Sequence, residues 1–437
     1  MTLLLLALLV AVPADDPFAK HGKLRVAKPG THLEHADGKP FFVLADTCWN
    51  GPALSTPEEW DFYLADRKKK GFTAIQVSLV APWSLVPADA EGNVSGTVVD
   101  GKWQPNEAYY KRVDARLKAI NDHGLLAMPV LLWALQKTKD LGRMLTVEQA
   151  TDLVTFEMRR YKGLNALWIL AGDNPYDAAE SAKWKAVGRA AFAAVPLPLV
   201  TTHPTGQNFP WLTGWDDETW LTVLGYQSGH GDSPGQWKWT HSGPPAEYGK
   251  RTTFTRPVLN LEPPYEGHNA YQSKKPHSDF NSRRAAYWGL LVHPPCGVTY
   301  GGHGVWGWQT KAGDEQTGHK GTGPAKVWRD ALDLPGAAQY GHIRKLFEGV
   351  PFGELRPAQS LLGEQPGDGD PAKFVACAAT PDNRWLVAYS PTGGVRLKAF
   401  PAGAEAVWFD PRTGETHPCT ETTQPPGEGD WALVVRK

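Results

Sequence analysis

The sequence of 437 residues is too long for one ordinary domain, and it suits a barrel of about 250 residues or more with a small second domain. Lysine and arginine (45) balance aspartate and glutamate (46), the net charge is −1, and no basic stripe stands out. Nucleic-acid binding is therefore not expected, because it requires a basic surface that displaces counterions. The 19 tryptophans fit either a sugar-binding surface or a large aromatic core.

The N-terminus carries an apolar run from Leu3 to Val12, which has the length of a signal-peptide core and is too short to cross a bilayer. Val12-Pro13-Ala14 places small residues where a signal peptidase needs them. We therefore expect a signal peptide over residues 1–14 and a secreted or periplasmic protein. A buried N-terminal strand is the alternative. No other apolar run reaches transmembrane length, so no membrane span is expected.

Eight apolar, β-rich runs alternate with helical stretches between about residues 41 and 345. They cover residues 41–46, 72–80, 125–133, 166–173, 197–203, 221–227, 256–262 and 297–303. Such runs, separated by helices, are typical of a parallel sheet that is buried on both faces. Eight of them predict an α/β fold, a closed (β/α)8 TIM barrel over residues 15–350, with an open doubly wound sheet as the alternative.

Two stretches carry clear local signals. Ser55-Thr56-Pro57-Glu58-Glu59 offers an N-cap, a proline in the first turn and acids near the positive end of the helix dipole, so a helix should begin there. Residues 15–40 are expected to form an edge strand or a hairpin with a turn at His35 to Pro40.

Beyond Phe347 the helical pattern stops and short β-like runs follow. They cover residues 374–379, 385–389, 395–400, 406–409 and 431–435, and turn signals separate them. This pattern predicts a small all-β sandwich domain over residues 351–437.

Four cysteines leave the disulfide pattern open. Cys377 could pair with Cys419, and Cys48 with Cys296, but free buried thiols are equally consistent with the sequence. The chain contains neither CxxC nor HExxH, so we expect no metal and no other cofactor.

Polar and aromatic residues gather at the ends of the predicted strands, where barrel enzymes carry their active sites. Hydrogen-bonding groups and aromatic rings in such positions suit a sugar. The expected substrate-binding residues are Asp46, Trp49, Gln76, Trp133, His203, Gln227, Tyr265, His303 and Trp306. Asp46 could equally cap the first loop, and Trp306, with Trp308, could equally belong to the core.

Two carboxylates, Asp173 and Glu262, end the fourth and seventh predicted strands. Glycoside cleavage needs one protonated carboxyl group to assist the leaving oxygen and one ionised group to attack the anomeric carbon or activate water. We therefore predict that these two residues are catalytic. Either acid alone would be better explained as a helix cap or a salt-bridged loop residue. Glu266, four residues after Glu262, is a rival for its role.

Several segments resemble the apiosidase-like glycoside hydrolases (glycoside hydrolase family 140). These segments are residues 37–49, 63–76, 167–173, 257–263, 297–301 with Val305-Trp306, and 332–337. The resemblance implies that Asp173 is the acid/base, that Glu262 is the nucleophile, and that the substrate is apiose or a related sugar on pectin (rhamnogalacturonan II). The tail from about Leu355 is similar to the family's C-terminal β-domain, which is labelled collagen-binding. Ala171, where the family has glycine, and Pro263-Pro264 depart from the pattern.

The sequence thus predicts a secreted, retaining, exo-acting glycoside hydrolase that acts on side chains of plant polysaccharides. Hydrolysis of another sugar, such as an arabinoside or rhamnoside, is one alternative. A catalytically silent carbohydrate-binding or adhesion protein is the other. The carbohydrate substrate is the partner that we expect, and the sequence does not indicate an oligomeric state.

Overall fold

The computed structural model describes residues 16–81, 86–193, 198–212, 214–315, 319–400 and 402–437. The signal peptide expected over residues 1–14 lies outside this range. In the part of the chain that is described, no helix combines the length and apolarity needed to span a membrane.

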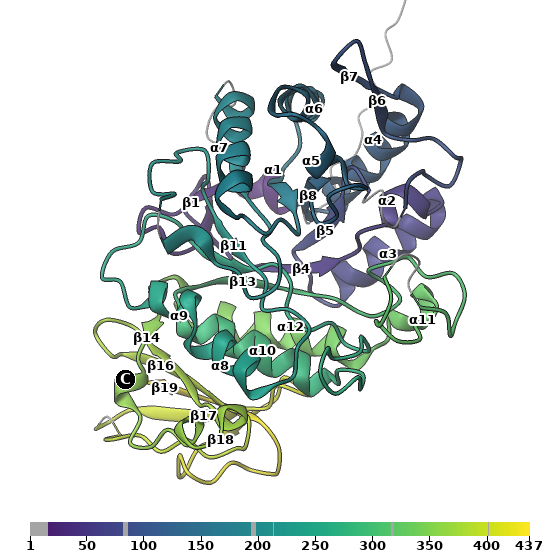
Figure 1. Cartoon of the computed structure of the whole chain (residues 1–437). Helices are drawn as coiled ribbons and strands as arrows, with labels where there is room; N and C mark the ends of the chain where they lie inside the picture. The colour runs from purple at the N-terminus through teal and green to yellow at the C-terminus, as the bar shows by residue number, and fades with distance from the viewer. Residues whose placement is uncertain (1–15, 82–85, 194–197, 213, 316–318, 401) are drawn as a thin grey trace, which may run out of the picture.

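Eight parallel strands form the centre of the molecule (Figure 1). They are β4 (Val43–Thr47), β5 (Ala74–Ser78), β8 (Leu126–Trp133), β9 (Leu167–Gly172), β10 (Leu199–Thr201), β11 (Leu224–Tyr226), β12 (Val258–Asn260) and β13 (Pro295–Tyr300). Their order in the sheet is β10-β9-β8-β5-β4-β13-β12-β11. The backbone N–H groups of Thr222 and Val223 both donate to Val200 O at 3.0 Å, which draws the edges at β10 and β11 together. The sheet is a nearly closed barrel, and the predicted fold is confirmed.

Helices cover the outside of the barrel. They are α2 (Gly51–Leu54), α3 (Pro57–Lys69), α4 (Glu107–Asp122), α5 (Leu141–Met144), α6 (Val147–Arg160), α7 (Ala178–Phe192), α8 (Pro234–Ser242), α9 (Pro244–Gly249), α10 (Asp279–Val292), α11 (Trp328–Ala331) and α12 (Pro335–Glu348). Between β10 and β11 the described residues contain only a 3-10 turn, Pro210–Leu212. The helix predicted at Thr56 is α3, and Thr56 and Glu59 form a reciprocal capping box at its start.

Short elements complete the barrel domain. The N-terminal segment forms α1 (Pro17–His21) and a three-stranded antiparallel sheet of β1 (Leu24–Val26), β2 (Leu33–His35) and β3 (Pro40–Phe41), so the predicted hairpin is present. A second hairpin, β6 (Gly96–Val99) and β7 (Lys102–Pro105), precedes α4.

Residues on each barrel strand alternate between the lumen and the helical layer. Val43 and Ala45 of β4 pack inward with Met128 and Ile169, in a core that the site aromatics Trp49 and Tyr265 also join. Leu44 packs outward with residues of α10 and α12. A polar residue near a strand end therefore reaches the mouth of the barrel or the surrounding helices according to its position in this alternation.

The C-terminal residues form a six-stranded antiparallel sheet. Its strands are β14 (Arg356–Pro357), β15 (Ala376–Ala379), β16 (Trp385–Ser390), β17 (Glu405–Phe409), β18 (Thr416–Pro418) and β19 (Trp431–Arg436), in the order β14-β15-β16-β19-β17-β18. The strand predicted at 395–400 is wrong. Its backbone bonds instead to Leu361 and Thr422, with one isolated bridge from Leu397 to Leu362, so no ladder forms.

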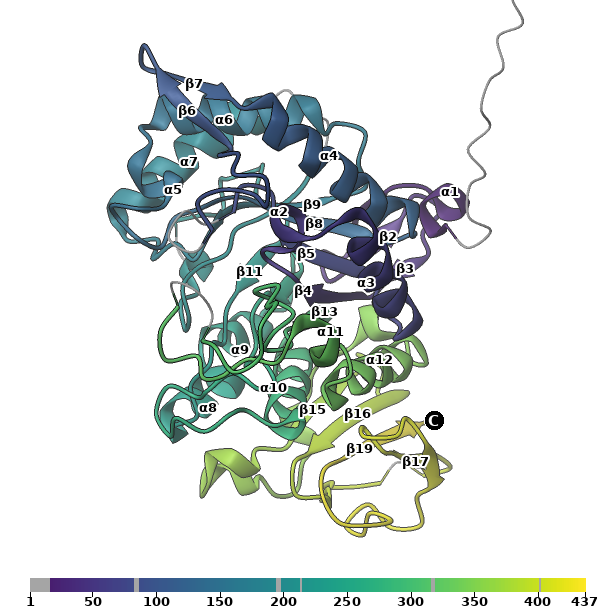
Figure 2. The same ribbon diagram turned by 90° about the vertical axis from the view of Figure 1, so that its right-hand side faces the viewer.

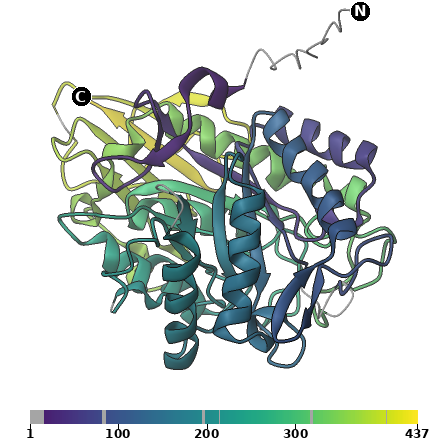
Figure 3. The same ribbon diagram turned by 90° about the horizontal axis from the view of Figure 1, so that it is seen from above.

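The C-terminal sheet packs directly against α10 and α12 (Figure 2). Tyr287 of α10 stacks on Tyr389 of β16 with ring centroids 4.4 Å apart. Arg283 binds both carboxylate oxygens of Asp430, at 2.8 and 2.7 Å. Viewed from above, the C-terminal sheet lies on the side opposite α4, α6 and α7 (Figure 3). Residues of α10, α12 and the β-domain therefore belong to one hydrophobic cluster at their interface, while the β-domain has a second cluster of its own.

All four cysteines are free thiols, so neither of the possible disulfides is present. Cys48, Cys296 and Cys377 are buried, and Cys48 Sγ lies 3.6 Å from Val305 O.

Candidate active site

The structure brings Asp173 and Glu262 together at the C-terminal mouth of the barrel. Asp173 directly follows β9, and Glu262 stands two residues beyond β12. One oxygen of each carboxylate and one nitrogen of His203 all lie within 4.8 Å of one another. The side chains are 17% and 9% exposed respectively, so the pair is mostly buried but remains accessible.

The backbone at Asp173 has an uncommon conformation that directs its side chain. Its φ is +50°, in the left-handed region where aspartate is tolerated better than most residues. The preceding Gly172 packs against the Trp133 indole, and a Cβ there would lie 2.7 Å from Trp133 Cε3. Glycine at 172 therefore permits a large aromatic ring beside the acid. Strained backbone of this kind is frequent at functional sites.

His203 lies between the two acids. Its Nδ1 is 3.6 Å from Asp173 Oδ1 and accepts the Asp173 backbone N–H at 3.4 Å. Because Nδ1 accepts, the hydrogen of the neutral ring is on Nε2, which lies 3.3 Å from Glu262 Oε2. Burial disfavours the charged ring, but Glu262 and Asp173 together raise the pKa of His203 above its usual value.

A second histidine, His230, holds the other oxygen of Glu262. His230 Nδ1 accepts the backbone N–H of Tyr265 at 3.3 Å. The hydrogen of the neutral ring is therefore on Nε2, which donates to Glu262 Oε1 at 2.8 Å. This hydrogen bond works with neutral histidine and favours the ionised form of Glu262.

The two carboxyl groups consequently differ in acidity. Burial and the negative charge of Glu262 raise the pKa of Asp173 to about 7, although His203 and a 3.1 Å hydrogen bond from Gln227 Nε2 oppose the shift. Burial alone would raise the pKa of Glu262 too, but the imidazoles of His203 and His230 hold it well below its usual range. Near neutral pH, Asp173 can carry a proton while Glu262 is ionised, which is the division of roles that glycoside cleavage requires.

Aromatic and amide side chains line one side of the pair. The Trp49 ring lies 4.9 Å from that of Trp133 and 5.7 Å from that of His203, and Trp133 Nε1 donates to Ser78 Oγ at 2.8 Å. Gln76 reaches across the lumen and donates to Leu261 O at 3.0 Å.

The other side consists of residues from the loops after β12 and β13. The rings of Tyr265 and Trp306 are 6.2 Å apart. Trp306 Nε1 donates to His303 Nδ1 at 3.1 Å, which leaves His303 Nε2 to donate to Gly323 O at 2.8 Å. Of the residues expected to bind substrate, eight of the nine thus lie around the acid pair or in the aromatic walls beside it.

Asp46 is not in this group. It lies on the outer side of β4, where it accepts a hydrogen bond from Tyr63 OH at 2.7 Å and faces Arg67 Nε at 3.4 Å. Glu266, the rival for the role of Glu262, also points elsewhere. Its carboxylate accepts from Tyr300 OH at 2.7 Å and from the Gly336 N–H at the start of α12 at 2.9 Å.

Although the sequence allows His230 a contact with a sugar hydroxyl or a neighbouring carboxylate, the site residues expected from the sequence include neither His230 nor His268. Their rings stack with centroids 4.3 Å apart, next to Tyr265 and Tyr271. His230 stands four residues beyond β11 and not at the strand end, so the strand-end pattern did not select it. Within the described residues, Asp173, His203 and Glu262 are also the group whose spacing could accommodate a metal ion. No other donor cluster of that kind was found there.

Residues 27–354 match the sequence model of the apiosidase-like catalytic domain family. The chain belongs to the apiosidase-like family. A solved structure described as a glycoside hydrolase is 25% identical to this apiosidase-like chain, with a TM-score of 0.79 and coverage of 96% of this chain and 98% of that one. The apiosidase-like chain is therefore a glycoside hydrolase, as predicted.

Two further solved structures share the fold of the apiosidase-like chain. A glycoside hydrolase family 5 protein from Bacteroides vulgatus ATCC 8482 is 24% identical with a TM-score of 0.79, over 96% of this chain and 94% of that one. A family 5 mannosidase from Rhizomucor miehei is 11% identical with a TM-score of 0.53, over 75% and 99%. No curated protein sequence matches the chain significantly.

Proposed function

We propose that this enzyme is a retaining, exo-acting glycosidase with Asp173 as acid/base and Glu262 as nucleophile. The observation that carries the proposal is the carboxylate pair, whose oxygens approach within 4.8 Å and whose pKa values are shifted in opposite directions. Retaining enzymes hold their carboxyl groups about 5–5.5 Å apart, whereas inverting enzymes need about 6.5–9.5 Å to admit a water molecule. The short approach favours direct attack by Glu262.

In the first step, Glu262 attacks the anomeric carbon while Asp173 gives its proton to the departing glycosidic oxygen. The product is a glycosyl ester on Glu262 and a free alcohol. In the second step, the Asp173 carboxylate takes a proton from water as that water attacks the anomeric carbon and releases Glu262. His230 Nε2 donates to Glu262 Oε1 at 2.8 Å and orients the nucleophile.

We also propose a class of substrate. Membership of glycoside hydrolase family 140 would make it apiose or a related sugar on pectic side chains such as those of rhamnogalacturonan II, cleaved by a secreted enzyme. An arabinoside or rhamnoside would require the same acid pair and is the alternative. Binding of collagen by the β-domain is not part of this proposal; one face of its sheet packs on α10 and α12.

A product profile on pectic oligosaccharides tests the proposal. The wild-type enzyme should release one monosaccharide, and Asp173→Asn and Glu262→Gln should each reduce turnover by orders of magnitude without unfolding the protein. The anomeric configuration of the first-formed product, followed by NMR, should be that of the substrate. Near-normal turnover by either variant, or an inverted product, would contradict the assignment.

A further inference from the structure

An exposed aromatic ring stands beside the histidine that binds the nucleophile. Tyr271 is 47% exposed, and its ring lies edge-on to His230 at 5.6 Å and to His268 at 6.0 Å. The other large aromatic side chains with comparable exposure among the described residues are Phe62 (49%) and Phe400 (46%). Phe62 is on α3, and Phe400 is in the β-domain, so neither belongs to the site.

Tyr271 is fixed in a braced turn. Its backbone N–H donates to His230 O at 3.0 Å, and Ala270 N–H donates to Lys275 O at 2.8 Å, which closes the turn. Side chains bind the turn to Asp232 on the neighbouring loop, since Gln272 Oε1 accepts the Asp232 N–H at 2.8 Å and Asp232 Oδ1 accepts the Ser273 N–H at 3.1 Å. The turn that carries the ring therefore needs little further ordering when a ligand stacks on the ring.

The position of the Tyr271 ring relative to the two acids indicates which part of a substrate the ring would contact. The Tyr271 ring contacts the ring of His230, whose Nε2 donates to Glu262 Oε1 at 2.8 Å, so one side chain separates Tyr271 from the nucleophile. Burial and the negative charges of Glu262 and Asp173 also raise the pKa of Tyr271. In an exo-acting enzyme, the released sugar is enclosed beside the nucleophile and the rest of the substrate extends toward solvent. An exposed ring at this position meets the rest of the substrate.

We propose that Tyr271 is the stacking platform for the sugar ring of the leaving group. The apolar C–H face of a sugar and an aromatic face are complementary, and stacking removes both from water. This inference rests on the proposed function, because it requires hydrolysis of a saccharide at Asp173 and Glu262. It identifies Tyr271 as the side chain that binds the substrate beyond the cleaved bond.

The test compares two substrates of the same released sugar. One is an oligosaccharide that the wild-type enzyme cleaves, and the other is the matching glycosyl fluoride, whose leaving group has no ring. Tyr271→Ala should lower kcat/KM for the oligosaccharide about tenfold, mainly through KM, and leave the fluoride within about twofold. Tyr271→Phe keeps the ring and should behave as wild type. Phe62→Ala removes an equally exposed ring on α3 and should change neither reaction.

Three results would overturn the inference. Equal losses on both substrates would mean that Tyr271 only supports His230, and no loss on the oligosaccharide would mean that the ring makes no contact with the leaving group. A tenfold loss with Tyr271→Phe would assign the effect to the hydroxyl group. If the wild-type enzyme hydrolysed neither substrate, the proposed function itself would fail, and that result is distinct from the other three.

Discussion

The strongest stability prediction concerns Asp430, which joins the β-domain to the barrel. Asp430 binds Arg283 of α10 through two hydrogen bonds of 2.7 and 2.8 Å and accepts a third from Tyr389 OH at 2.9 Å, and both charged side chains are only 2% exposed. Asp430→Asn keeps the size of the side chain but removes the negative charge. It leaves the Arg283 guanidinium buried without its main counter-charge, which typically costs about 3–5 kcal/mol.

Equilibrium denaturation in guanidinium chloride, followed by tryptophan fluorescence, measures this loss. The matched control is Asp122→Asn, because the Lys118–Asp122 pair has similar distances but side chains that are 64% and 52% exposed. Such an exposed helical pair is worth about 0.3–0.5 kcal/mol. A loss of less than about 1 kcal/mol for Asp430→Asn would refute the view that this buried ion pair fastens the β-domain to the barrel.

The remaining predictions concern the active site. Asp173 must be protonated for the first step, so kcat/KM should fall as the pH rises through about 7, and a constant rate up to pH 9 would contradict its role as acid. His230→Phe removes the donor that keeps the pKa of Glu262 low, so the acidic limb of the same pH profile should move to higher pH. Gly172→Ala should reduce both activity and melting temperature, because its Cβ would lie 2.7 Å from the enclosed Trp133 ring; wild-type values for both would show that the ring has room to move.

The barrel could be predicted from the sequence because its strands are buried on both faces. Each is a nearly continuous apolar run, and each of the eight predicted runs overlaps an observed strand. The antiparallel β-domain has shorter strands with weaker signals. Residues 395–400 combine a buried Val395 with an exposed Phe400, and this mixture resembles a half-buried strand although the segment forms no ladder.

In the candidate site, too, the sequence predicts some residues and not others. Asp173 and Glu262 could be singled out because they follow two strands closely, and the ends of parallel strands meet at one mouth. A continuous apolar run does not reveal which residues face the lumen, so the sequence could not show that Asp46 faces Tyr63 and Arg67. His230 lies in a loop, and its contact with Glu262 depends on how the loops after β11 and β12 fold together.

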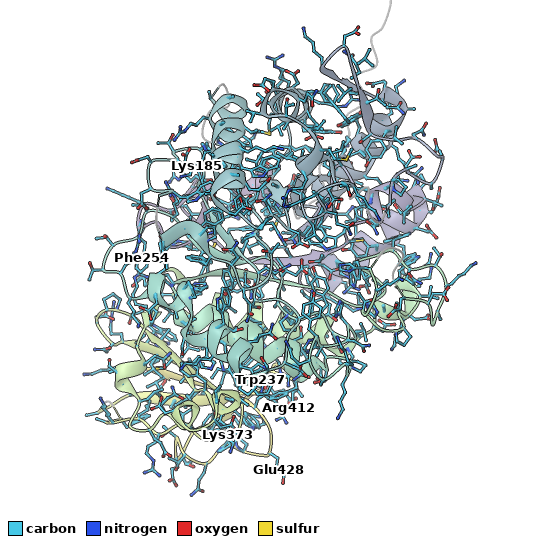
Figure 4. The ribbon with its side chains drawn as sticks, viewed as in Figure 1. Lys185, Trp237, Phe254, Lys373, Arg412 and Glu428 are labelled. Carbon is cyan, nitrogen blue, oxygen red and sulfur yellow. The ribbon has the colours of Figure 1, made fainter. Side chains whose placement is uncertain are left out.

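The sequence could not predict how the β-domain packs on the barrel. Trp237 of α8 lies at the edge of the barrel that faces the β-domain, where Lys373 and Arg412 are found (Figure 4). Helix α8 contacts the turn Pro371–Lys373, and Trp288 Nε1 donates to Phe374 O at 2.8 Å. These contacts cross between segments more than 80 residues apart, and no local pattern predicts them.

Trapping of the covalent intermediate tests the central claim most directly. A 2-deoxy-2-fluoro glycoside of the released sugar, with a good leaving group, should accumulate a glycosyl ester because the second step is slowed. Proteolysis and mass spectrometry should then place the added mass on Glu262. An adduct on Glu266 or on another residue, or turnover with inversion and no adduct, would contradict a double displacement at Asp173 and Glu262.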